Sequence, residues 1–88
     1  MKKLVQVQEV DGEGLIALLG QRVTLFCLNY IYTGTLTGVN EQDALLEDAA
    51  IVYETGAFAD KEWKDAQTLP GQWYVRLGCI ESYGVLKG

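Results

Sequence analysis

The chain has 88 residues, enough for one small domain, and 49% of them are hydrophobic, which excludes an intrinsically disordered tail. Its 7 basic and 12 acidic residues leave a formal net charge of −5, which excludes a strongly basic protein that binds nucleic acid mainly by phosphate neutralisation. The chain contains no His, so Ser–His or Cys–His catalytic pairs and a His-based zinc site are excluded as well.

The first predicted elements are a strand and a short helix. Valines alternate with glutamines in residues 4–10, and this period of two predicts a half-buried strand. Residues 15–19 place apolar side chains at helical spacing, with Asp11 as a candidate N-cap and Gly20 as a candidate C-terminal stop. We therefore expect a short N-terminal helix, preceded by an extra strand.

The middle of the chain has the pattern of three strands joined by turns. Apolar residues alternate from Arg22 to a predicted turn at residues 29–30. Threonines alternate with Gly and Leu in residues 32–38, where glycine inside a strand marks a sharp bend or a close backbone approach. Residues 40–43 predict the next turn, and the apolar residues of 44–53 predict a long third strand.

The last third of the chain predicts an irregular segment and two more strands. Residues 55–70 are expected to be irregular apart from a helical turn over residues 60–65. Residues 73–77 predict a fourth strand, and residues 79–86 predict a fifth after a break at Gly78.

This order predicts a mainly β protein with a short N-terminal helix and five short, strongly bent strands. So few strands close best as a small antiparallel barrel, because an open five-stranded sheet would leave one face uncovered. We expect residues 1–88 to form a single domain of this kind.

The order of these motifs resembles the Sm/LSm-like family. The family's first motif has a helix ending in Gly, then Gly-x-Leu-x-Gly and a closing Asp-Ala, which residues 20–25, 34–40 and 46–49 resemble. Its second motif, an apolar residue followed by Arg-Gly, is similar to residues 75–83. The match spans residues 15–86, and its specificity comes from the order of the motif elements along the chain. The resemblance implies an Sm-like barrel of the SH3-like class.

The resemblance also implies candidate RNA-binding residues. Family members that bind RNA use an Asp and an Asn between the second and third strands, and the Arg and Gly of the second motif. Asn40 stands at the Asp position and Asp43 at the Asn position; Arg76 keeps the Arg, Leu77 replaces the Gly, and Gly78 follows. Because a carboxylate accepts hydrogen bonds but cannot donate them, any preference for a base would differ from that of the family.

Each candidate also has a structural interpretation. Asn40 and Asp43 can simply form the turn, and Arg76 can pair with an acidic residue of a neighbouring strand. Tyr30 and Tyr32 are expected to face opposite sides, so at most one of them is expected in the core. Three aromatic residues form either a stacking platform or part of the core or an interface: Trp63, Trp73 and Tyr74.

The resemblance further implies a homo-oligomeric ring, because family members join their fourth and fifth strands between subunits. Residues 80–86 carry neither Pro nor Lys in their interior to prevent such pairing. The candidate interface residues lie in or beside these two strands: Trp73, Tyr74, Val75, Ile80, Ser82, Tyr83 and Val85.

Cys27 and Cys79 lie in apolar runs without the close spacing of zinc or redox motifs. Such cysteines are typical of buried thiols in a reducing compartment, and a disulfide between them is the alternative. Residues 1–7 do not have the pattern of a signal peptide, and no apolar run reaches the length of a membrane span. We therefore expect a cytoplasmic protein without a membrane partner.

Two functions remain as alternatives. The first is a ring that binds single-stranded RNA, but not duplex DNA, as a non-catalytic scaffold. The second is a structural or protein-interaction ring that has lost RNA binding, which Leu77 and the acidic residues between Arg22 and Lys61 favour. An enzyme is not expected, because only carboxylate pairs could act as acid and base, and no cofactor or metal is expected.

Overall fold

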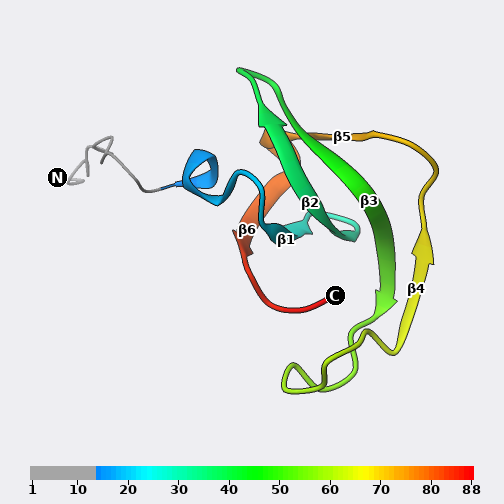
Figure 1. Ribbon diagram of the computed structural model, residues 1–88. Helices are drawn as coiled ribbons and strands as arrows, with labels where there is room; N and C mark the ends of the chain where they lie inside the picture. The colour runs from blue at the N-terminus through cyan, green and yellow to red at the C-terminus, as the bar shows by residue number, and fades with distance from the viewer. Residues whose placement is uncertain (1–13) are drawn as a thin grey trace, which may run out of the picture.

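The computed structural model describes residues 14–88 and is mainly β, with the strands arranged in one antiparallel sheet (Figure 1). The strand predicted over residues 4–10 and the cap at Asp11 lie outside the described residues. In chain order the elements are η1 (Leu15–Leu18), β1 (Arg22–Cys27), β2 (Ile31–Val39), β3 (Asp43–Glu54), β4 (Asp65–Thr68), β5 (Trp73–Arg76), η2 (Leu77–Cys79) and β6 (Ile80–Gly84).

The first three strands form an antiparallel meander, as the alternation of apolar residues predicted. Strand β1 pairs with β2 through Leu25 opposite Tyr32, and β2 pairs with β3 through Leu36 opposite Leu46. Strand β3 is one continuous, strongly curved strand, and Asp48 in its middle has a φ of 48° (Figure 1). An Asp tolerates this left-handed conformation better than most residues, and the pairing with β2 shifts register at the same place.

Strands β4 and β5 act as two halves of one long strand beside β3 (Figure 1). Thr68 of β4 pairs with Ala50, and Trp73 of β5 pairs with Leu46. Five steps along the chain from Thr68 to Trp73 therefore face four steps from Leu46 to Ala50, so one extra residue bulges out of the pairing. Strand β4 lies in the segment 55–70 that was expected to be irregular, so residues 14–88 contain six strands where five were expected.

The sheet does not close into a complete barrel, which corrects the prediction. Its strand order is β4-β3-β2-β1-β6, and β5 pairs with β3 beside β4. Within residues 14–88, β5 pairs with no strand but β3, and β6 pairs with no strand but β1, because η2 joins them without a shared ladder. The physical reason is that η2 turns the chain sharply within three residues, from one edge of the sheet to the other.

The predicted short N-terminal helix is only one turn of 3-10 helix, Leu15–Leu18. Gly14 precedes this turn with a φ of 84° and no side-chain cap, and Ile16 and Leu19 are exposed. Glycine at the start of a helix costs conformational entropy, so packing sustains a single turn here. No helix in the described part of the chain is long and apolar enough to cross a membrane.

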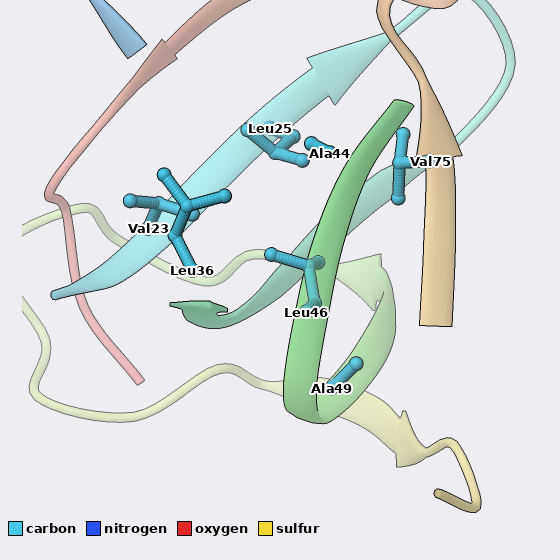
Figure 2. Close-up of a cluster of buried hydrophobic side chains, with 7 residues drawn as sticks. All are labelled: Val23, Leu25, Leu36, Ala44, Leu46, Ala49 and Val75. Atoms are coloured by element: carbon cyan, nitrogen blue, oxygen red, sulfur yellow. The ribbon is translucent and has the colours of Figure 1, made fainter. Parts of the chain in front are cut away.

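The core lies in the concave side of the bent sheet. Figure 2 shows seven buried side chains from four strands that point toward one another: Val23, Leu25, Leu36, Ala44, Leu46, Ala49 and Val75. Gly34 of β2 is required here, because a Cβ at this position would lie 3.1 Å from the Glu47 carbonyl oxygen and 3.1 Å from the Ala49 Cα. The close approach of β2 to the bend in β3 thus depends on a residue without a side chain.

Residues 55–64 and 85–88 cover further apolar residues outside this core. Phe26 of β1 contacts Phe58 edge-to-face, with ring centroids 6.3 Å apart. The Lys87 ammonium group donates to the carbonyl oxygens of Thr55 (2.8 Å) and Ala57 (2.6 Å) and lies 4.9 Å from the centroid of the Trp63 ring. The helical turn predicted over residues 60–65 is absent, and this segment is a loop that leads into β4.

Candidate functional site

The first cluster of candidate residues lies at the turn between β2 and β3. The side-chain oxygen of Asn40 accepts hydrogen bonds from the backbone N–H groups of Gln42 (2.8 Å) and Asp43 (2.7 Å). The Asn40 N–H in turn donates to the Asp43 carbonyl oxygen (3.0 Å). This is an Asx-type turn, so the structural interpretation of Asn40 is confirmed. Its amide NH2 group is still able to donate to a ligand.

The structure brings Asp43 and Arg76 together. They are direct partners in the pairing of β3 with β5, and the Leu77 N–H donates to the Gln42 carbonyl oxygen (2.8 Å) just beyond them. Arg76 is exposed and Asp43 is half-buried. Within residues 14–88, Arg76 forms no ion pair, which differs from the pairing considered from the sequence. Asn40 and Asp43 of one turn and Arg76, which is distant from them in the chain, therefore lie at the same end of the sheet.

Leu77 and Gly78 take different places in the turn η2. Leu77 packs against the core, so it contributes to the fold rather than to an open binding surface. Gly78 is exposed, and a Cβ at this position would meet no atom within 4 Å. The backbone of η2 therefore does not require glycine at position 78.

Arg76 stands out among the basic side chains of residues 14–88. Arg22 donates to the Gly88 carbonyl oxygen, Lys64 pairs with Glu54 at 3.4 Å, and Lys87 binds two carbonyl groups. Two basic side chains in this part of the chain, Arg76 and Lys61, have no such partner. An incoming anion would meet Arg76 at the cluster of candidate residues.

An aromatic cavity adjoins Arg76, and the sequence analysis did not identify it. It has a volume of about 260 Å³ and lies between the β1–β2 turn and the junction of β5 with η2. Tyr30 and Tyr32 both line it, with ring centroids 6.4 Å apart and planes inclined by 61°. The expectation that the two rings face opposite sides is therefore wrong, because residues two apart in an extended chain lie on the same face. Tyr74 contributes a third ring from β5.

Of the two interpretations of Trp63, Trp73 and Tyr74, the shared stacking platform does not form. Trp73 packs against the core, as the other interpretation expected, and Trp63 lies under Lys87 within the loop of residues 55–64. Tyr74 alone of the three lines the aromatic cavity, and it is 61% exposed. The signal that could have located the cavity is the set of three tyrosines beside the two turns that meet there.

Both cysteines lie at the same cavity, and both thiols are free. Cys27 is half-buried, and burial raises its pKa from 9.0 to about 11, with smaller contributions from Cys79 and Glu81. Burial also raises the pKa of Tyr32, with smaller contributions from Cys27 and other neighbours. Cys79 is exposed, which corrects the prediction of two buried thiols, because it ends the turn η2 instead of lying inside a strand.

The candidate interface residues divide between the core and the surface. Val75 is 5% exposed and belongs to the core, and Trp73 and Ile80 pack against it. The side chains of Tyr74, Ser82 and Tyr83 are exposed. Val85 is exposed too, but lies beyond the end of β6. Any contact between subunits at β5 would therefore use its backbone edge together with Tyr74.

Comparison of the chain with known proteins found no relative. No protein-family model matches the chain, and no curated protein or solved structure matches it.

Proposed function

We propose that this chain is an Sm-like protein, built on an open, strongly bent sheet, that binds single-stranded RNA as a non-catalytic scaffold in a homo-oligomeric ring. The observation that carries the proposal is the pairing of Asp43 with Arg76 next to the Asn40 turn. A carboxylate, an amide and a guanidinium are then within reach of one ligand. Together they can accept from a base, donate to a base and bind a phosphate.

The strand arrangement supports the same proposal. A long bent β3, the pairing of both β4 and β5 with it, and a 3-10 turn leading into β6 are compatible with an open variant of the Sm-type sheet. In the described part of the chain, β5 and β6 each keep one edge without a strand partner. Exposed edges of this kind favour pairing with another chain, and pairing between copies would repeat the Arg76 cluster around an axis.

The alternative, a ring that binds proteins and not RNA, also has support. The Asn40 oxygen is already used by the turn, and Leu77 is packed against the core where the family has Gly. The chain also carries a net charge of −5, which repels a phosphate backbone. Binding to RNA would therefore depend on few contacts, and its salt dependence would be shallow for each subunit.

Fluorescence anisotropy with short uridine-rich or adenine-rich single strands at low salt tests the proposal. Arg76→Ala should weaken binding while the native mass of the assembly stays unchanged. Asp43→Asn, which restores the amide that the family has, should strengthen binding. Lys61→Ala is the matched control, because it removes an equal charge that lies far from the cluster along the chain. If neither wild type nor Asp43→Asn binds any of these strands, the RNA proposal fails and the protein-interaction ring replaces it.

A further inference from the structure

The cavity beside Arg76 is lined mainly by aromatic and other apolar side chains. Its wall contains three tyrosines, two cysteines, Leu28 and Val75, and its polar members are Asn29 and Arg76. Tyr32 packs against the core, which holds its ring in place. Tyr30 is 50% exposed and Tyr74 is 61% exposed, so both rings present free surface to a ligand. The inclined rings of Tyr30 and Tyr32 form a corner in place of a closed sandwich.

The positive charge of Arg76 limits which kinds of ligand this aromatic cavity can bind. Aromatic cages bind ammonium cations by their π faces, usually without a competing cation. Here Arg76 is part of the wall, and no carboxylate lines the cavity among residues 14–88. A cationic ligand would be repelled, whereas a planar ring linked to an anionic group would stack on tyrosine and place its charge at the guanidinium.

The size of the cavity limits the ligand further. Its volume of about 260 Å³ lies below the roughly 300–1,000 Å³ of pockets that enclose drug-sized molecules. One planar ring system fits this size. A proline-rich peptide binds along an extended aromatic groove, which is larger than one cavity of about 260 Å³.

We propose that the cavity of Tyr30, Tyr32 and Tyr74 binds one unstacked nucleobase of a single strand, with the adjoining phosphate at Arg76. This inference rests on the proposed function, because it assigns where one base of the bound RNA lies. It adds a second contact region to the Asn40–Asp43 turn, and Arg76 connects the two. Base stacking supplies affinity beyond what the two unpartnered basic groups of residues 14–88, Lys61 and Arg76, can obtain from phosphates.

A strand that carries 2-aminopurine tests the cavity directly, because the fluorescence of this base is quenched when it stacks. Tyr30→Ala and Tyr74→Ala should each weaken binding about 5- to 150-fold and abolish the quenching. Tyr74→Phe should keep both, since its ring still stacks. Tyr53→Ala is the matched control, because Tyr53 is 53% exposed but does not line the cavity.

The outcomes separate this inference from the proposed function. If RNA binding depends on Arg76 but not on Tyr30 or Tyr74, the cavity assignment is overturned and the RNA function stands. If no RNA binds, adenosine and uridine monophosphates are titrated while the tyrosine ring resonances are followed by NMR. Shifts confined to Tyr30, Tyr32 and Tyr74 would support the cavity as a nucleotide site, and their absence would overturn it. Displacement of 2-aminopurine RNA by a proline-rich peptide, with equal loss in Tyr74→Ala, would assign the cavity to peptide and overturn it too.

Discussion

At the scale of single residues, Gly34 and Gly38 make a matched pair on β2. A Cβ at position 34 would lie 3.0 Å from the Leu46 Cβ and 3.1 Å from two backbone atoms of β3, whereas one at position 38 would lie 3.7 Å from the Leu45 Cβ. The first contact requires the backbone of β3 to move, and the second is ordinary van der Waals contact. The two glycines therefore differ in what they do, although the sequence pattern presents them alike.

We predict that Gly34→Ala lowers the free energy of unfolding by about 1–3 kcal/mol, the usual cost of overpacking. Gly38→Ala should leave it unchanged or raise it slightly, because alanine restricts the unfolded chain more than glycine does. Urea denaturation of the two variants and wild type measures both effects. Equal stability of the two variants would show that β2 does not pass so close to the bend of β3.

The two thiols should differ in reactivity. A thiol reagent at pH 8 should label the exposed Cys79 quickly and Cys27 slowly, because the pKa of Cys27 is raised to about 11 and its thiolate is scarce. Cys79→Ser should remove the fast phase and Cys27→Ser should leave it. Fast labelling that survives in Cys79→Ser would contradict the burial of Cys27.

The same shift in pKa predicts a dependence of stability on pH. As the pH rises past 9.0, the Cys27 thiol ionises in the unfolded chain before it does so in the folded chain, whose pKa is about 11. The contribution of Cys27 to the free energy of unfolding is therefore complete below pH 9 and is lost as the pH rises to about 11. Over this interval stability should fall more steeply in wild type than in Cys27→Ala. Parallel curves would contradict the prediction.

At the scale of elements, the sequence predicted β1, β2 and β3 because each has a buried face and therefore an alternating pattern. It missed β4, since Asp65–Thr68 are all exposed and no apolar alternation marks the strand. It predicted a helix at residues 15–19 from apolar spacing and candidate caps, although packing there supports a single turn. At the candidate site, the sequence placed Asn40 and Arg76 at turn and strand positions correctly. It could not place the tyrosines, because the cavity depends on how two distant turns meet.

Residues 55–64 depend on the contacts of Lys87. Lys87→Ala removes two hydrogen bonds to carbonyl groups and the contact with the Trp63 ring, so we expect a loss of about 1–2 kcal/mol in the free energy of unfolding. Chymotrypsin should also cut the native variant faster after Phe58 or Trp63. Lys61→Ala, at the exposed tip of the same loop, is the control and should change neither quantity. If the two variants behave alike, the Lys87 contacts do not hold this loop.

At the scale of the whole molecule, the proposed ring depends on the outer edge of β6. Strand β6 pairs with β1 through Ser82 opposite Phe26 and Tyr83 opposite Leu25. Successive residues of an antiparallel strand direct their N–H groups to opposite edges. One of Ser82 and Tyr83 therefore donates toward β1, and the other directs its N–H group to the free edge.

Proline at the two positions should separate assembly from folding. Of Ser82→Pro and Tyr83→Pro, we expect one to lose the β-sheet signal in circular dichroism, and the other to keep it but to have the native mass of a monomer. Native mass spectrometry and circular dichroism on both variants give the result. A wild type that is monomeric at micromolar concentration would remove the ring from the proposal.

The unequal pairing at the bend means that neighbouring strands use different numbers of residues to cover the same part of the curved sheet. Between the paired positions that include Leu46 and Ala50 of β3, the chain advances by four residues in β3. It advances by three in β2, from Thr33 to Leu36, and by five in the outer β4–β5 segment, from Thr68 to Trp73. Deleting one residue between Thr68 and Trp73 would give the outer segment the same length as its partner in β3 and would flatten the sheet there. The curvature that encloses the core therefore depends on the number of residues in each strand segment, so an insertion or deletion of one residue would change the fold at the bend.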